Sequence, residues 1–453
     1  MSGLALPVSE MSSHPIGRAL HDSKRKARTN GEANKLDAID RPAHSWYRFI
    51  LSYPPHLVRN YLHRFDAGAD TVCLDPFCGT GTTPVECKKL GISSIGIESH
   101  PMSYFAAQVK TDWTPDPSGL ISHAEDIAAY ALSQLEVDGI SDEGHNGRIR
   151  SSDLWALEPE AESLLLRNSI SPLPLHKTLV LLDTLRARSG SQYHRHELLA
   201  LAQALVTVIG NLHFGPEVGI GPPKKDAPVI APWLANVRSM ADDLTRLGGN
   251  WQTTSKIIRA DARDLLGIIQ PNSVSAVITS PPYPNEKDYT RTTRLETVLL
   301  GILQTKAELR AVKKGLMRSN TRNVYVGDDD DSWVAKHVDI QKIAQKIERR
   351  RIEMKKTSGF ERMYAKVTTL YFGGMARHLH QMKSILRPGA QLAYVVGDQA
   401  SYLRVMIRTG QLLADIAKSQ GYEVIGIDLF RTRFSTATGD NLREEAVLLR
   451  WPG

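Results

Sequence analysis

Short apolar runs rich in β-branched residues alternate along much of the chain with segments whose apolar residues recur at helical spacing. This alternation is typical of an α/β fold, in which helices cover a sheet. We expect strands at residues 72–74, 94–97, 256–261, 275–279, 387–398, 422–430 and 444–451. We expect helices at residues 84–89, 370–386 and 411–419.

Residues 111–250 interrupt this alternation and are expected to form a mainly helical insertion. Residues 198–208 are strongly apolar, and residues 233–247 show the 3.6-residue period of an amphipathic helix. A loop rich in Gly and Pro at 214–228 is expected to separate these two helices.

A second insertion, residues 302–366, is rich in Lys and Arg and is a candidate for contact with a polyanion. It contains an acidic run at 328–331, which we expect to be a turn. The remaining residues divide into a flexible basic N-terminal arm (1–43) and a sheet domain in three parts (44–110, 251–301 and 367–453). The basic cluster of the arm either stays solvated or contacts phosphates.

The charge balance of the 453 residues favours a polyanionic partner. Lys and Arg number 56 against 49 Asp and Glu, and the sequence pI is about 9.1. No apolar run approaches the ~20 residues that cross a bilayer. The polar N-terminus lacks a signal-peptide core, so we expect a cytoplasmic protein with no membrane partner.

Metal and disulfide chemistry are not expected from the cysteines and histidines. The three cysteines, Cys73, Cys78 and Cys87, lack C-x-x-C spacing and are expected to be small buried hydrophobic residues. The histidines that invite a metal assignment, His194, His196 and His213, have no Cys or carboxylate cluster at ligand spacing.

The stretch TVCLDPFCGTGTT, residues 71–83, is predicted to be a strand that ends in a tight loop and opens onto a helix. Gly79 and Gly81 let the backbone approach a bulky ligand closely, and Asp75 places a carboxylate at the end of the strand. A dinucleotide fingerprint would need glycine where Pro84 stands, and a phosphate-binding P-loop would need a lysine after Gly81. Neither pattern fits.

The same stretch resembles motif I of the S-adenosylmethionine-dependent methyltransferases, above all the DNA amino-methyltransferases, although tRNA guanine-N2 methyltransferases also carry DPFCGTG. The resemblance implies a cofactor, S-adenosyl-L-methionine, and a Rossmann-like, seven-stranded class I sheet whose last strand is antiparallel. Glu98, at the end of the next strand, is similar to the motif II acid that hydrogen-bonds the ribose. The implied cofactor-binding residues are Asp75, Pro76, Phe77, Cys78, Gly79, Gly81, Thr82, Glu98, Asp261, Ala262 and Thr279.

Two further segments extend the resemblance. Residues 44–65 are similar to motif X, which helps to bind the methionine end of the cofactor, so motifs X, I and II lie in the first part of the sheet domain. Asp261 resembles the motif III acid that accepts a hydrogen bond from the cofactor's adenine amine. Motifs III and IV therefore lie in the second part.

The tetrapeptide Ser280-Pro281-Pro282-Tyr283 follows a predicted strand and forms a rigid corner that offers acceptors and few donors. Such a corner suits a substrate amine, and it resembles motif IV of the amino-methyltransferases. The resemblance implies that the Ser280 side chain and the Pro281 carbonyl bind the target amine, and that Tyr283 stacks on a base turned out of its helix. Transfer would be direct, without a metal, and no cysteine beyond Cys87 could serve a C5-cytosine mechanism.

The predicted function is therefore methylation of an exocyclic amine in double-stranded DNA. T-S-P-P-Y is commoner among cytosine-N4 enzymes, so we favour cytosine N4 over adenine N6. RNA guanine-N2 methylation and a DNA-binding regulator with a vestigial cofactor fold are the alternatives. Arg291 and Arg294 are expected to position the DNA, and a restriction or phage-defence system is the expected partner. The host would be a bacterium or archaeon, with the protein at the nucleoid when bound to DNA.

The order of the motifs departs from the group whose motif I is most similar. In that group motif IV commonly precedes motif I, whereas here motifs X and I come first. The region that reads the target sequence is therefore not assigned by analogy.

Overall fold

The structure is a computed structural model, which describes residues 36–453 except 48–51, 145–152, 216, 286 and 436–438. Most of the predicted N-terminal arm, with its basic cluster, lies outside the described residues. The first described elements are a 3-10 turn, Ala38–Asp40, and the short helix α2, Arg41–His44.

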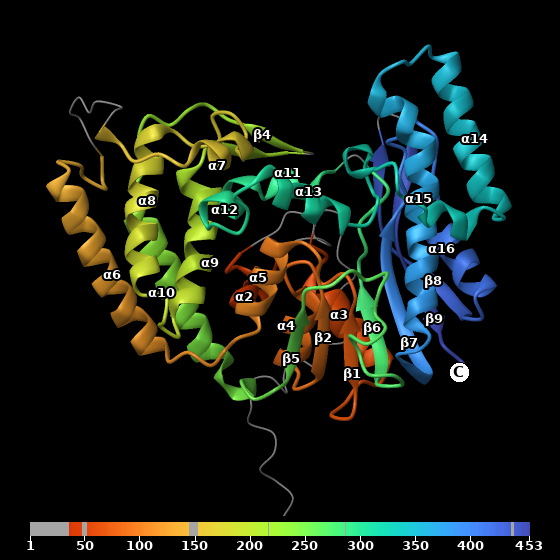
Figure 1. Ribbon diagram of the computed structural model, residues 1–453. Coiled ribbons are helices and arrows are strands. Elements are labelled where there is room, and N and C mark those ends of the chain that lie inside the picture. Colours follow the sequence, from red (N-terminus) through yellow and green to blue (C-terminus); the bar gives the residue numbers. More distant parts are fainter. Residues whose placement is uncertain (1–35, 48–51, 145–152, 216, 286, 436–438) are drawn as a thin grey trace, which may run out of the picture.

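A seven-stranded sheet forms the centre of the molecule (Figure 1). Its order is β5-β2-β1-β6-β7-β9-β8, and every neighbouring pair is parallel except the two that involve β9. The strands are β1 (Val72–Asp75), β2 (Ser93–Ile97), β5 (Ser255–Ile258), β6 (Val274–Thr279), β7 (Leu386–Gly397), β8 (Glu423–Ser435) and β9 (Asp440–Arg450). The predicted seven-stranded methyltransferase-type sheet with an antiparallel strand β9 is confirmed.

The strand order reverses between β1 and β6. From β1 the chain adds β2 and then β5 on one side, and it returns to add β6 and β7 on the other side. In an open α/β sheet, a crevice forms outside the carboxyl ends of the strands at such a switch point. The topology therefore directs attention to the loops that follow β1 and β6.

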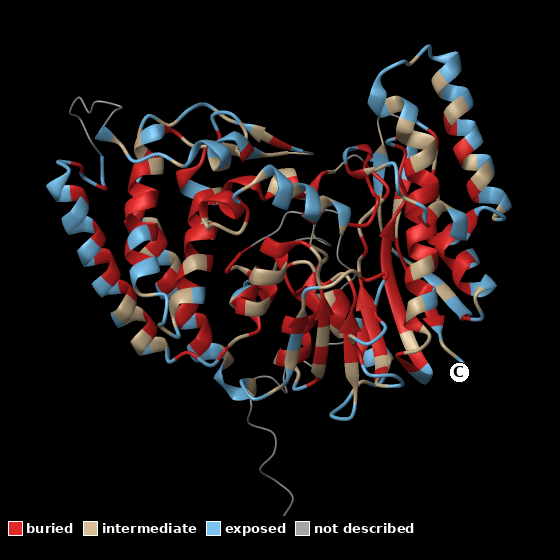
Figure 2. Cartoon of the chain, viewed as in Figure 1, coloured by how far each residue is buried: buried red, intermediate tan, exposed pale blue. Residues whose placement is uncertain are grey.

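Helices cover both faces of the sheet, because successive strand residues point to opposite sides. Helices α3 (Pro55–Arg64) and α4 (Thr82–Lys89) pack on the face that carries Cys73 and Ala393. Helices α15 (Gly359–Met382) and α16 (Thr409–Ser419) pack on the face that carries Leu74 and Tyr394. Figure 2 shows the strands as a buried layer between helices whose outer faces are exposed.

The first insertion is mainly helical and lies beside the sheet, where it extends one hydrophobic core from α5 (Pro101–Lys110) outward (Figure 1). Its helices are α6 (Pro117–Val137), α7 (Pro159–Leu164), α8 (Pro172–Ala187), α9 (His194–Ala204) with a π-helical turn (Leu205–Ile209), and α10 (Ile230–Leu247) with a 3-10 turn (Gly248–Asn250). The predicted loop at 214–228 needs a correction, because its first part forms a short antiparallel hairpin in which β3 (Leu212–Phe214) pairs with β4 (Val218–Ile220).

Two short helices, α11 (Tyr289–Thr292) and α12 (Arg294–Leu299), follow β6 and precede the second insertion. The insertion contains α13 (Lys306–Lys314), two 3-10 turns (Thr321–Asn323 and Asp330–Val334) and α14 (Val338–Glu353), and it leads into α15. Figure 1 shows α11, α12 and α13 between the helical insertion and α15. The division of the chain into domains remains a prediction.

The acidic run at 328–331 leads into the 3-10 turn Asp330–Val334 and is held by ion pairs. Asp328 pairs with Arg318, and Asp330 pairs with both Arg263 and Arg377. Asp330 is buried, and its backbone oxygen approaches Gly373 of α15, where an added Cβ would come within 1.9 Å. The run therefore fastens the second insertion to the sheet domain through ion pairs and close backbone contact.

Two predicted boundaries also shift. The third strand ends at Ile258 rather than at Asp261, which leaves Asp261 in a loop. The helix predicted to reach residue 386 ends at Met382, because Leu386 already pairs with Val274 as the start of β7. None of the described helices combines the length and apolarity needed to cross a bilayer.

Candidate active site

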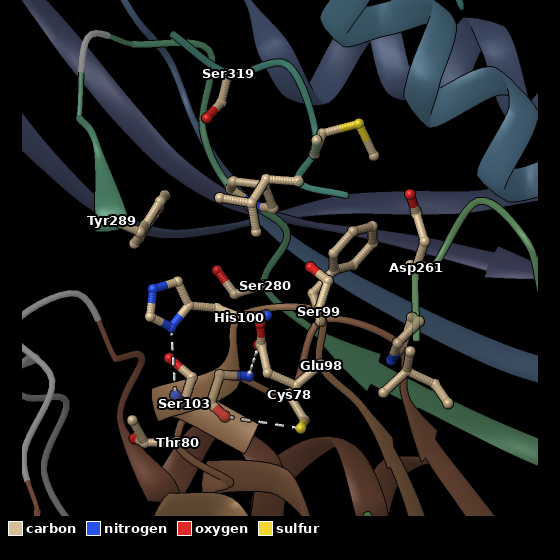
Figure 3. A pocket seen from close by; sticks show the side chains of 18 of the residues that line it. Cys78, Thr80, Glu98, Ser99, His100, Ser103, Asp261, Ser280, Tyr289 and Ser319 are labelled. Atoms are coloured by element: carbon tan, nitrogen blue, oxygen red, sulfur yellow. Dashed lines mark hydrogen bonds between the residues drawn. The ribbon is translucent and has the colours of Figure 1, made fainter. Parts of the chain in front are cut away.

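A cavity of about 960 Å³, including the space open to solvent, lies at the carboxyl ends of β1, β2, β5 and β6 (Figure 3). This is the place that the strand reversal marks. Its walls come from the loops after these four strands, from residues 52 and 53, and from the second insertion. The lining residues are Ser52, Tyr53, Pro76, Phe77, Cys78, Gly79, Thr80, Thr82, Ile97, Glu98, Ser99, His100, Ser103, Ala260, Asp261, Ala262, Ser280, Pro282, Tyr289, Leu316, Met317, Ser319 and Asn323.

The glycine loop takes its shape from backbone conformations that favour glycine. Gly79 has φ +53° and Gly81 has φ +93°, and Gly81 is the N-cap of α4. A Cβ on Gly81 would also lie 3.2 Å from Ala107 of α5. The loop can therefore turn sharply and leave the mouth of the cavity unobstructed by side chains.

Glu98 is held in place by two backbone donors. The N–H of Gly79 donates to Oε2 at 2.8 Å, and the N–H of His100 donates to Oε1 at 2.7 Å. Burial raises the pKa of Glu98 to about 7, although both hydrogen bonds act in the opposite direction. Each carboxylate oxygen has a second lone pair for a ligand hydroxyl group.

Asp75 does not line the cavity but lies behind its wall, where it accepts hydrogen bonds from neighbouring residues. Its carboxylate is fully buried and accepts hydrogen bonds from Thr279 Oγ1 at 2.6 Å, Phe77 N at 3.1 Å and Tyr53 Oη at 3.1 Å. Burial raises the pKa of Asp75 to about 6. These bonds tie the ends of β1 and β6 together, so the pair Asp75 and Thr279 braces the two loops that meet at the cavity.

Asp261 lines the cavity at the side opposite Ser280 in Figure 3. Arg263 donates to Oδ1 from Nε at 3.0 Å and to Oδ2 from Nη2 at 2.6 Å. Arg263 is itself buried and also bonds Asp330 of the second insertion. The orientation of the Asp261 carboxylate is therefore set by an arginine that joins it to the acidic run.

The proline corner places Ser280 and Pro282 in the cavity wall. The Ser280 hydroxyl donates to the carbonyl oxygen of Val395 at 3.0 Å. Because the proton is committed to Val395, the lone pairs of Oγ remain as acceptors. An amine that enters the cavity can donate to them.

Tyr283 is not among the residues that line the cavity, but its side chain interacts with that of Ser280, which does line it. The role of Tyr283 as a stacking surface stays a prediction. The ring of Tyr283 lies against Gly397 of β7, where an added Cβ would approach Cε2 within 2.9 Å. Pro281 is buried and is also not among the lining residues. Tyr289 and Tyr53 both line the cavity, and Tyr289 lies at the same end as Ser280 and His100 in Figure 3.

The expected DNA contact of Arg294 is not supported by its environment. The side chain is buried, and its guanidinium donates to Thr290 O at 2.9 Å and to Leu164 O at 3.1 Å. It therefore ties α12 to the end of α7 instead of facing solvent. Arg291 is partly buried, and its Nε has no hydrogen-bond partner among the described residues.

Of the eleven residues expected to bind the cofactor, eight line the cavity: Pro76, Phe77, Cys78, Gly79, Thr82, Glu98, Asp261 and Ala262. Asp75, Gly81 and Thr279 support the wall from behind. All three cysteines are buried, and within the described residues no group of three or more His, Cys, Asp or Glu is placed to hold a metal.

Sequence reasoning missed several lining residues. Tyr53 belongs to the segment that resembles motif X and was not singled out within it. His100 follows Glu98 closely, and burial lowers its pKa to about 4, so it is neutral near pH 7. The segment from Leu316 to Asn323 lies in the second insertion and carries no motif that points to the cavity.

The residues present fit S-adenosylmethionine. Phe77, Ile97 and Met317 provide apolar surface for an adenine ring, Glu98 offers acceptors to a ribose, and Asp261 offers acceptors to an amine. The glycine loop leaves room for the chain that bears the sulfonium. This site, at the switch point of a sheet with this strand order, defines a class I methyltransferase that uses S-adenosylmethionine.

Comparison with known proteins narrows the class. A family model described as a DNA methylase, for N6 and N4 methyltransferases, matches residues 21–108. The chain contains the glycine loop and Glu98 within this match. It is similar to the type II methyltransferase M.BsoBI of Geobacillus stearothermophilus, with 24% identity over 444 residues, which cover 92% of this chain and 85% of that protein.

Two further matches give the range of similarity. The type II methyltransferase M.AvaI of a Nostoc species is 24% identical over 426 residues, which cover 89% of this chain and 83% of that protein. Among solved structures, the rRNA methyltransferase AviRa of Streptomyces viridochromogenes aligns over 93% of this chain and 96% of that chain, with a TM-score of 0.32 and 11% identity.

Proposed function

We propose that the protein methylates the exocyclic amine of a base that is turned out of double-stranded DNA, at cytosine N4 rather than adenine N6. The observation that carries the proposal is the shared cavity. Glu98 and Asp261, expected to hold the cofactor, and Ser280, expected to hold the amine, line one space. The preference for cytosine rests on Ser280 in the first position of the proline corner.

The residues divide the work between the two ends of the cavity. When bound, S-adenosylmethionine supplies an electrophilic methyl group on a sulfonium centre. Glu98 and Asp261 orient the cofactor, while Ser280 Oγ accepts an N–H of the target amine and so directs the nitrogen lone pair. An extrahelical base is required because its amine is inaccessible within the duplex.

Type II methyltransferases are among the relatives, which supports a role as the modification enzyme of a restriction system. In that role, methylation of a specific short sequence would protect DNA from a partner nuclease. The net charge of +7 suits a nucleic-acid substrate.

The test is methyl transfer from labelled S-adenosylmethionine to DNA that lacks modified bases, followed by nucleoside analysis. Labelled N4-methylcytosine is expected. N6-methyladenine alone would refute the choice of base, and label on RNA but not on DNA would refute the choice of substrate. The absence of label on either, together with intact cofactor binding and cofactor-independent DNA binding, would favour a regulator instead.

A further inference from the structure

Part of the cavity wall comes from the segment Leu316–Asn323, to which no motif assigns a role. Leu316, Met317, Ser319 and Asn323 line the cavity, and Ser319 lies at the end that holds Ser280 and Tyr289 (Figure 3). Apart from the exposed Arg322, every residue of this segment is buried, and five of those seven are polar or charged. A buried polar segment is stable only where its groups find partners.

Most of the segment's polar groups do find partners. The guanidinium of Arg318 forms two 2.8 Å bonds with Asp328, and the carbonyl oxygen of Ser319 accepts from Tyr402 Oη at 3.0 Å. Asn320 is fully buried, and its amide donates to Lys287 O at 3.1 Å and accepts from Arg322 N at 3.1 Å. The wall is thus held firmly by contacts outside the cavity.

Asn323 is the exception. Its side chain is only 1% exposed, it lines the cavity, and its Oδ1 has no hydrogen-bond partner among the described residues. Of the described residues that line the cavity, only Asn323 has a buried side-chain polar atom without a hydrogen-bond partner. An acceptor left unpaired in this way destabilises the ligand-free protein, and a donor from a ligand would relieve the cost.

The chemistry of the donor follows from the amide. A carboxamide offers an acceptor and a donor side by side, which matches a base edge where an exocyclic amine adjoins a ring nitrogen acceptor. Adenine and cytosine both have such an edge. A ribose hydroxyl is a poorer match, because Glu98 already offers acceptors for hydroxyl groups on the β2 side of the cavity.

We infer that Asn323 is a binding residue whose Oδ1 accepts a hydrogen bond from the exocyclic amine of a nucleobase held in the cavity. The inference rests on the proposed function for the nature of its ligands. Two sources supply this amine, the target base of the DNA and the adenine of the cofactor. In either case Asn323 contributes to base recognition from an insertion that lies far from the motifs in sequence.

The experiment compares Asn323→Leu with Asn320→Leu. Both changes lie in the same buried segment, and each replaces the four non-hydrogen atoms of an Asn side chain with the four of a Leu side chain. Three quantities are measured for each variant and for the wild type: the unfolding temperature without ligand, the affinity for S-adenosylhomocysteine, and the kcat/KM for DNA at saturating cofactor. Asn320→Leu breaks two hydrogen bonds and is expected to lower the unfolding temperature. Asn323→Leu removes an unpaired acceptor, so its unfolding temperature is expected to equal or exceed that of the wild type.

Binding then identifies the amine. If it belongs to the target base, Asn323→Leu lowers kcat/KM for DNA about tenfold to a hundredfold and leaves the affinity for S-adenosylhomocysteine unchanged. If it belongs to the cofactor, the affinity for S-adenosylhomocysteine falls by the same factor. Values within twofold of the wild type in both binding measurements would overturn the inference, as would a loss of unfolding temperature equal to that of Asn320→Leu.

The test of Asn323 can be distinguished from the test of the proposed function. A wild-type protein that methylates no DNA would refute the proposed function, whereas the affinity for S-adenosylhomocysteine would still test Asn323. In that case an unchanged affinity in Asn323→Leu would overturn the inference as well.

Discussion

The protonation of Glu98 is expected to control the affinity for the cofactor near neutral pH. Burial raises the pKa of this carboxyl group to about 7, and we propose that its oxygens accept hydrogen bonds from the ribose of the cofactor. Two ribose hydroxyls donate to the charged carboxylate more strongly than to the neutral acid. Binding therefore favours the deprotonated protein, and affinity is expected to fall as the pH falls through 7.

The magnitude follows from the fraction of charged carboxylate. With a pKa of about 7, roughly nine-tenths of the Glu98 side chains are charged at pH 8 and roughly one-tenth at pH 6. If only the charged form binds the ribose, the dissociation constant rises about tenfold between these two values. The buried carboxyl of Asp75, with a pKa raised to about 6, is half protonated at the lower end of this range, but it does not line the cavity and offers no acceptor to the ligand.

Calorimetric titration with 5′-methylthioadenosine from pH 6 to pH 8 measures this effect. The probe keeps the adenine and the ribose but lacks the amino acid groups that would titrate themselves. Glu98→Gln is the control, and it is expected to bind weakly with an affinity that does not change over this range. A wild-type dissociation constant that stays constant between pH 6 and pH 8 would refute the reasoning.

The stability of the ligand-free protein provides a check of opposite sign. Because the folded-state pKa of Glu98 is raised above the unfolded value of 4.5, its contribution to stability is present at acid pH and is lost as the pH rises through about 7. The free energy of unfolding of the wild type, relative to Glu98→Gln, is therefore expected to decrease from pH 5 to pH 8. Ligand binding and ligand-free stability thus respond to pH in opposite directions.

Three further predictions concern separate parts of the structure. Gly373→Ala is expected to lower the free energy of unfolding by about 3 kcal/mol, because the new Cβ meets the backbone oxygen of Asp330. Gly374→Ala is the control and is expected to lower it less, because its Cβ meets the flexible side chain of Met317. Equal losses of unfolding free energy in denaturant titrations of the two variants would contradict this reasoning. Ser280→Ala is expected to lower kcat by about tenfold to a hundredfold without a change in cofactor affinity, and an unchanged kcat in single-turnover assays would rule out its role as an acceptor. Tyr289→Leu is expected to raise the KM for DNA about tenfold through lost stacking, with Tyr289→Phe close to the wild type; no difference between the two variants would count against the stacking role.

Local sequence patterns were sufficient for the sheet and for one side of the site. The glycine loop and the acid that ends β2 were predictable, because a strand, a tight turn and a helix start leave their signals within about a dozen adjacent residues. The proline corner was predictable for the same reason. Parallel strands bring such loops together at one edge, so the sharing of a cavity by Glu98, Asp261 and Ser280 could be expected before any coordinates.

Tertiary structure alone decided which side chains face the cavity and which support it. Tyr283 and Arg294 were both expected to contact the DNA. Tyr283 packs against Gly397, and the guanidinium of Arg294 donates its hydrogen bonds to Thr290 and Leu164. The segment that contains Asn323 joins the wall through pairings such as Asp330 with Arg263, which are 67 residues apart in sequence. Burial and charge pairing over such distances depend on how whole elements pack, and no local period or spacing records them.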